Sequence, residues 1–128
     1  MALFLFLGLV SFMDEFYDRH MDEFNERRYW LSLSVCNGIG PTRFQKLLHH
    51  FGSAKHAWFA NEKEIIDSRI GEKVSQELAK FRNTFSIDRY EEKMQKMEIS
   101  YLTLQDKGYP DLLKLIKRPP PEIGRAHV

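Results

Sequence analysis

Two glycines and a proline fall within four residues, at Gly38-Ile39-Gly40-Pro41. An apolar run that contains a tryptophan precedes them, and an amphipathic, basic run follows. Glycine enters left-handed backbone conformations at little cost, so we expect Gly38 to end the first helix. Pro41 suits the first turn of a second helix, where its missing N–H is no loss. The segment therefore predicts two helices joined by a tight turn, with Ile39 pointing into the core.

The segments on either side of this turn have the patterns of buried and half-buried helices. Asp22–Cys36 is predicted to be a central helix, because it begins with acids that suit the positive end of the helix dipole and is almost wholly apolar from Tyr29 onward. Pro41–His50 is predicted to be a second helix, which Gly52 ends, and Ser53 is expected to cap the next one. Its apolar side chains recur at i, i+3, i+4 and i+7 and predict one buried stripe. These residues are Phe44, Leu47, Leu48 and Phe51.

The remainder of the chain is predicted to be helical and then to change period. Two amphipathic helices are expected after Gly71 and Ser86, each with an apolar stripe. Ile99–Leu104 is rich in strand-forming residues and predicts one short strand. A helical turn, Asp111–Ile116, is expected to follow and to stop at Lys117-Arg118-Pro119-Pro120-Pro121. The predicted fold class is mainly α, a small helical bundle followed by one short strand and a helical turn.

Charge is distributed unevenly along the chain. The formal net charge is only +1, so the whole molecule has no strong attraction for nucleic acid. From Tyr29 to Asn61, however, there is no acid, while Arg43, Lys46 and Lys55 lie inside this stretch. We therefore expect any anion-binding surface around the predicted turn. The alternative is a chance fluctuation on a solvated face.

No enzyme, metal site or cofactor site is predicted. The chain has one cysteine, Cys36, which excludes an internal disulfide and paired-cysteine zinc sites and fits a reducing, cytoplasmic compartment. His49 and His50 are adjacent, so their rings point to different sides of a helix and do not predict a metal site. There is no nucleophile–base pair, no P-loop, and no third glycine of a dinucleotide fingerprint. We therefore name no catalytic residue and no metal ligand.

The first twelve residues form an apolar run that is too short to cross a bilayer, which takes about 20 residues. A basic region and a small-residue cleavage site are both lacking, so a signal peptide is not expected either. The run either packs on the domain as a strand or helix, or precedes the true start at Met13 or Met21. We favour the second interpretation and treat residues 1–20 as an extension that is not native. No membrane partner is expected.

Several short motifs occur in an order that resembles the N-terminal part of the DNA-processing protein A family (DprA, also called Smf). The resemblance spans about Tyr29 to Pro121, and its most specific part is Tyr109-Pro110-Asp111-Leu112-Leu113 followed by Pro119-Pro120. The other motifs are Trp30-Leu31-Ser32-Leu33, Gly38-Ile39-Gly40-Pro41, Leu47-Leu48 with Phe51-Gly52-Ser53, Ala57-Trp58, and Ile99 through Thr103.

This resemblance implies a domain organisation. Residues 21–98 would be a sterile-alpha-motif-like domain that carries a helix-hairpin-helix, and residues 99–121 would begin a Rossmann-like domain that is cut off. Glu122–Val128 departs from the family pattern and reads as what a widely used sequencing adapter encodes in this frame. We therefore expect residues 122–128 to be a tail that is not native.

The resemblance also implies a function. Members of the family protect incoming single-stranded DNA during natural transformation and load the RecA recombinase, and they have no established catalytic activity. This chain would then be an accessory domain of such a protein, with DNA, a RecA-type recombinase and a second copy of itself as partners. The main DNA pocket of the family lies in the Rossmann-like domain and has no matching positions here.

The turn is the predicted place of DNA contact. Its backbone amides would meet a phosphate at the start of the second helix, and its cations would add charge. With so few charges, affinity should be weak, roughly 0.1 mM. The aromatic residues Trp58, Phe59, Phe81 and Phe85 are expected in the core rather than as stacking platforms for bases. The predicted DNA-binding residues are Gly38, Ile39, Gly40, Thr42, Arg43 and Lys46.

Two other functions fit the turn. One is a stand-alone protein-interaction or dimerisation module in which the glycines serve the fold alone. The other is a non-specific, double-strand-binding helix-hairpin-helix domain of a repair protein. The Tyr109-Pro110 segment argues against the second, since such a domain has no need of it.

Overall fold

The computed structural model describes the backbone of residues 2–126 and the side chains of residues 11–125. This part of the chain is mainly helical, with one small antiparallel sheet, which confirms the predicted fold class. The elements are α1 (Ala2–Val35), α2 (Pro41–Phe51), α3 (Ala54–Phe59), α4 (Glu62–Asp67), α5 (Glu72–Thr84), α6 (Ile87–Lys96), β1 (Ile99–Thr103), α7 (Asp111–Lys114) and β2 (Glu122–Ala126).

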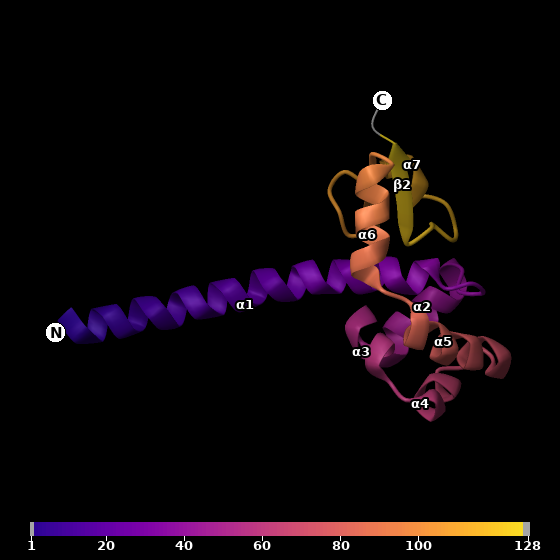
Figure 1. Cartoon of the computed structure of the whole chain (residues 1–128), viewed down its shortest axis with the longest axis horizontal. Helices are drawn as coiled ribbons and strands as arrows, with labels where there is room; N and C mark the ends of the chain where they lie inside the picture. Colours follow the sequence, from indigo (N-terminus) through magenta and orange to yellow (C-terminus); the bar gives the residue numbers. More distant parts are fainter. Residues whose placement is uncertain (1, 127–128) are drawn as a thin grey trace.

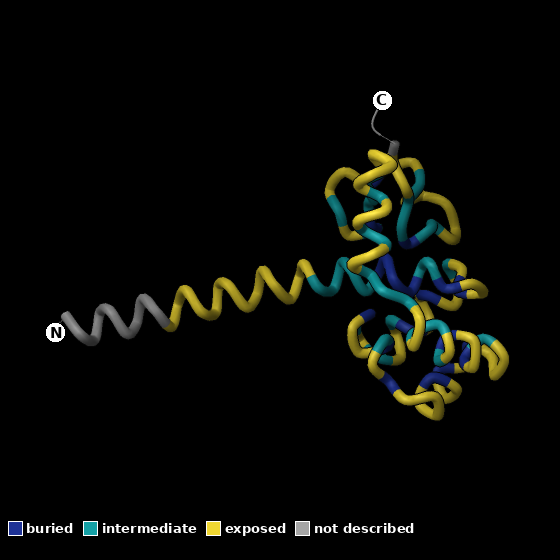
Figure 2. Tube along the Cα trace, in the orientation of Figure 1, coloured by how far each residue is buried: buried dark blue, intermediate teal, exposed yellow. Residues whose placement is uncertain are grey.

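The C-terminal half of α1 runs between two groups of elements (Figure 1). Helices α2 to α5 lie on one side of it, and α6, the sheet and α7 lie on the other. The N-terminal half of α1 extends away from both groups, and residues 11–24 are exposed (Figure 2). None of the helices in the described range 2–126 is both long and apolar enough to span a membrane.

The core lies between α1 and the α2–α5 group. The Trp30 and Phe44 rings meet edge to face, with their centroids 4.8 Å apart. Phe44 and Leu47 are fully buried, and Leu48 and Phe51 pack against the core, so the predicted stripe of α2 is confirmed. The other buried members of this cluster are Leu33, Cys36, Ile39, Ala54, Ala57, Ala60, Ile65, Ile70 and Leu78.

The predicted helix ends are confirmed where the cap is local. Gly52 adopts a left-handed conformation, φ 83°, and ends α2. The Ser53 hydroxyl accepts the N–H of His56, and the Ser86 hydroxyl accepts the N–H of Arg89. Such side-chain caps satisfy N–H groups that have no partner within the helix. These boundaries are therefore set by residues next to the helices they begin or end.

Helix α1 is longer than predicted. It was expected to begin at Asp22, but it begins at Ala2, and the acids from Asp22 onward lie in its middle. Residues 2–21 contain no proline and a single glycine, Gly8, so nothing in this stretch stops the helix. The explanation of these acids as helix-dipole partners is therefore wrong. Residues 11–20 do not pack on the domain, because they are exposed.

The sheet has a second strand that the sequence did not predict. β2 pairs antiparallel with β1, with Ile99 opposite Ala126 and Thr103 opposite Glu122. The Pro119–Pro121 run leads into it, since the Pro121 carbonyl accepts the N–H of Leu104 at 2.9 Å. The prolines keep this run from continuing a helix, and the edge of β1 offers unpaired backbone groups to the strand that follows. That residues 122–128 are not native stays a prediction.

Two adjacent arginines of α1 bind the second group of elements. Arg27 donates to the Tyr101 carbonyl at 2.5 Å and to the Asp106 carboxylate at 3.1 Å. Its guanidinium lies over the Tyr101 ring, 4.1 Å from the centroid. Arg28 pairs with Glu91 at 2.7 Å and also with Asp88. The hydrogen bond to Glu91 raises the pKa of Arg28.

Glu26 of α1 caps the start of α3 across a large sequence separation. Its carboxylate accepts the N–H of Ala54 at 2.6 Å, the N–H of Lys55 at 3.1 Å and the indole N–H of Trp30 at 3.2 Å. Hydrogen bonds to a charged acceptor are stronger than neutral ones. This cap therefore fixes the angle between α1 and α3.

We expect Glu26→Ala to lower the free energy of unfolding by about 1–3 kcal/mol, because three N–H donors lose a charged acceptor. Urea unfolding followed by tryptophan fluorescence measures the change. Glu23→Ala is the matched control, because it removes an exposed carboxylate from the same helix. An equal loss in the two variants would contradict the long-range cap.

Candidate nucleic-acid interface

The turn between α1 and α2 has the backbone geometry that its glycines require. Gly38 lies in the left-handed region at φ 91°, and the Ile39 N–H donates to the Cys36 carbonyl at 3.3 Å. Gly40 is the N-cap of α2 at φ −90°, and its carbonyl accepts the N–H of Phe44 at 2.9 Å. The Ile39 side chain is buried in the core. In a DNA contact, Ile39 therefore offers its backbone rather than its side chain.

Helix α2 begins without a side-chain cap. Gly40 has no side chain to supply one, and no side chain in the described part of the chain caps this helix. Pro41 lacks an N–H, which leaves the amides of Thr42 and Arg43 as donors in the first turn. The helix dipole adds partial positive charge at the same place. This end of α2 thus favours an anion, although it lacks one of the usual donors.

Two of the predicted cations also hold the turn in place. Arg43 Nε donates to the Ile70 carbonyl at 2.9 Å, and its Nη1 donates to the Gly38 carbonyl at 3.1 Å. Lys46 Nζ lies 3.3 Å from the Arg69 carbonyl. Arg43 thus joins the turn to the segment before α5. Both residues are exposed.

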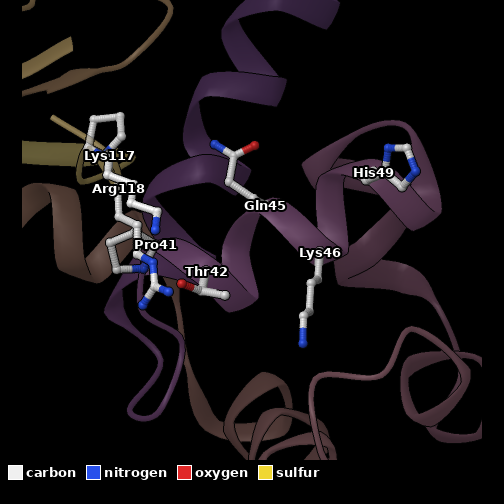
Figure 3. A pocket seen from close by; sticks show the side chains of 8 residues that line it. Pro41, Thr42, Gln45, Lys46, His49, Lys117 and Arg118 are labelled. Carbon is white, nitrogen blue, oxygen red and sulfur yellow. The ribbon is translucent and has the colours of Figure 1, made fainter. Parts of the chain in front are cut away.

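An open groove lies beside the first turns of α2, with a volume of about 480 Å³ (Figure 3). It brings the helix together with a segment some seventy residues further along the chain, in which Arg118 lies beside Pro41 and Thr42. No carboxylate lines it among the residues whose side chains are described. We call it the α2 groove. Its lining residues are Pro41, Thr42, Gln45, Lys46, His49, Lys117, Arg118 and Pro119.

Lys117 and Arg118 are the residues that sequence reasoning missed, since it assigned them only to the end of a helix. Both are exposed, and neither has an ion pair among the residues whose side chains are described. The sequence did carry one signal, because no acid occurs between Asp111 and Glu122. That signal says nothing of proximity to α2, which the sheet and its connections create.

The aromatic residues divide into two kinds. Trp58, Phe81 and Phe85 are partly buried, and the Phe81 and Phe85 rings stack with centroids 4.7 Å apart. Phe59, by contrast, is 66% exposed, so its prediction as a core residue is wrong. Phe59 is the last residue of α3, and its ring contacts only Tyr29 of α1 among the aromatic rings of the described residues, whereas Trp58 contacts Tyr29 of α1 and also Phe81 of α5.

No metal centre is present within the described side chains, residues 11–125, where no three His, Cys, Asp or Glu residues gather. Cys36 is buried, and burial raises the pKa of its thiol to about 11. A thiol with so high a pKa is a poor nucleophile at neutral pH. Cys36 is therefore a small core residue.

Comparison with known proteins finds a family that includes the turn between α1 and α2. A family described as the DprA-like N-terminal HHH domain matches residues 24–60, which run from α1 through the turn to the end of α3. Protein Smf of Synechocystis sp. is 32% identical over 100 residues, which cover 77% of this chain and 25% of that protein. The chain carries the N-terminal domain of the DprA/Smf family. It spans about a quarter of the length of this curated relative. No solved structure matches it.

The residues that match the DprA-like family form only one side of the α2 groove. Residues 24–60 include the turn and all of the α2 side of the groove. Lys117 and Arg118 lie outside that match. The groove is therefore a joint product of the DprA-like domain and the segment that follows β1 and α7.

The two glycines of the turn should respond differently to substitution. Gly38→Ala is expected to lower the free energy of unfolding by about 1–2 kcal/mol, because an alanine is strained at φ 91°. Space is not the cause, since an added Cβ would lie 3.5 Å from Val74. Gly40→Ala should be nearly neutral, because Gly40 has an ordinary φ and open space around it. Thermal or urea unfolding of both variants tests this, and equal losses would contradict the assigned roles.

Proposed function

We propose that this domain contacts DNA phosphates through the α2 groove. It would do so as the accessory N-terminal domain of a DprA-like protein that binds single-stranded DNA and loads a RecA-type recombinase during natural transformation. One observation carries the DNA contact. Lys46, Lys117 and Arg118 come from two distant segments and line one groove, which has no carboxylate among its described lining residues.

The chemistry of the groove suits a phosphodiester. Arginine and lysine neutralise phosphate charge, the first turn of α2 supplies free amides, and the Thr42 hydroxyl adds a donor. Contacts of this kind hold the backbone and read no sequence. With about three charges, we expect an affinity in the range of roughly 0.1 mM, which falls steeply with salt.

The single-stranded DNA and recombinase parts of the proposal rest on family membership. The family description and the name Protein Smf support a DprA-like domain, and this chain spans a quarter of that relative. Binding equally tight to duplex would instead favour the double-strand-binding alternative. No binding to either form would favour a protein-interaction or dimerisation module.

The paired exchange Lys117→Gln/Arg118→Gln should weaken binding of the whole chain to a labelled oligonucleotide about tenfold at low salt. It should also reduce the slope of log affinity against log salt by about 1.4, which corresponds to two phosphate contacts. Fluorescence anisotropy at several salt concentrations measures both quantities. Lys73→Gln/Lys93→Gln is the matched control, because it removes two exposed cations of α5 and α6 that do not line the groove.

An unchanged slope in Lys117→Gln/Arg118→Gln would refute the groove as the DNA contact. Equal losses in the groove and control variants would indicate a general charge effect instead. The recombinase part is tested separately, by surface plasmon resonance between this chain and a RecA-type recombinase. Absence of binding there would remove this domain from the loading step.

A further inference from the structure

We infer that the exposed ring of Phe59 is a stacking site for one unpaired base of a DNA strand whose backbone occupies the α2 groove. This inference rests on the proposed function and adds to it a contact between one side chain and a base of the strand. It starts from a single anomaly. A large aromatic side chain at the end of α3 is 66% exposed, while its neighbour Trp58 packs on the core.

The Phe59 ring is held in place although it is exposed. It makes an edge-to-face contact with Tyr29, with the ring centroids 5.4 Å apart and the planes at 71°. This contact limits the freedom of the ring and leaves most of its surface accessible. A ring that is already ordered loses little entropy when a base stacks on it.

Phe59 lies at a recess of about 490 Å³, which we call the Phe59 recess. Lys55 supplies a cation beside the ring. The one carboxylate among the lining residues, Glu64, is engaged by the Asn61 amide at 2.6 Å. The recess therefore offers a π surface and one cation, with a single carboxylate that already accepts a hydrogen bond from Asn61. Its lining residues are His50, Phe51, Lys55, His56, Phe59, Ala60, Asn61 and Glu64.

Helix α2 connects the two sites. Thr42 lines the α2 groove, and His50 lines the Phe59 recess, eight residues further along the same helix. Eight residues of α-helix span roughly 12 Å, a distance that a few nucleotides cover. Between them, Lys46 and His49 are exposed, and the stretch from Tyr29 to Asn61 contains no acid. None of the residues from Tyr29 to Asn61 therefore places a carboxylate next to a strand that crosses α2 from the α2 groove to the Phe59 recess.

The acidic part of α1 sets the limit of this path. Asp22, Glu23 and Glu26 line a separate recess on the α1 side of α3, which shares only Lys55 and His56 with the Phe59 recess. The three carboxylates of that recess would repel a phosphate more strongly than the single carboxylate, Glu64, of the Phe59 recess. The path of a strand therefore ends at Phe59 and does not continue onto α1.

The ligand is single-stranded rather than double-stranded DNA. In a duplex both faces of each internal base are covered by neighbouring bases, so a side chain on the surface reaches none of them. An unpaired base exposes its face and stacks on an aromatic ring whatever its sequence. Phe59 therefore adds affinity for single strands without adding sequence preference.

Phe59→Ala in the whole chain should weaken binding of a single-stranded oligonucleotide about tenfold and leave duplex binding unchanged. The matched control is Phe12→Ala, which removes a ring of similar exposure, 61%, from the extended part of α1. Phe59→Leu keeps an apolar contact with Tyr29 but removes the ring, so it should lose affinity as Phe59→Ala does. Anisotropy measures the affinities, and thermal unfolding checks that each variant is folded.

A second readout reports stacking directly. A fluorescent 2-aminopurine base in the oligonucleotide should be quenched by the wild-type chain and not by Phe59→Ala. Equal affinities of Phe59→Ala and Phe12→Ala, or an equal loss for duplex, would overturn the stacking site. If the proposed function itself fails, Lys117→Gln/Arg118→Gln will bind the oligonucleotide as tightly as the wild type does. That result distinguishes failure of the α2 groove from failure of the stacking site alone.

Discussion

The packing of the last turns of α1 between two groups of elements is the constraint on which the rest of the structure depends. One face of this segment carries Trp30 and Leu33, which are buried against α2 to α5. A neighbouring face carries Arg27 and Arg28, which bind the sheet and α6. The α2 groove has one wall from each group. It therefore exists only because a single helix fixes both walls.

The two attachments to α1 differ in physical character. The α2–α5 side is held by apolar burial, in which fully burying one large side chain contributes about 1.5–3 kcal/mol. The other side is held through arginines whose partly exposed ion pairs contribute only about 0–1 kcal/mol each. Their geometry is specific, however, because a guanidinium presents a rigid set of donors. Arg27 and Arg28 thus orient the second group more than they stabilise it.

Features that depend on neighbouring residues could be predicted from the sequence. The left-handed Gly38, the stripe of Phe44 and Leu47, and the caps at Ser53 and Ser86 each follow from local spacing. Features made by distant segments could not. The proximity of Arg118 to Pro41, the cap that Glu26 gives to α3, and the pairing of β2 with β1 all depend on tertiary contacts.

The candidate site was also predicted only where it depends on neighbouring residues. The turn and its cations were found, but Arg43 proved to bond the Ile70 carbonyl as well. A residue at the end of a short helix has no periodic signal for burial, which is why the exposure of Phe59 was missed. Lys117 and Arg118 were read as the end of a helix, since adjacent cations before prolines have no partner visible in the sequence.

A surface with so few charges suits an accessory role. Three phosphate contacts and one stacked base give weak affinity by themselves, roughly 0.1 mM before stacking. When two modules are joined by a short linker, the second binds at an effective concentration in the millimolar range. In the longer protein that we propose, a domain of about 0.1 mM affinity would then tighten the binding of one strand roughly tenfold. Weakness alone is therefore no argument against a role in binding DNA, provided that the linker lets both surfaces reach the same strand.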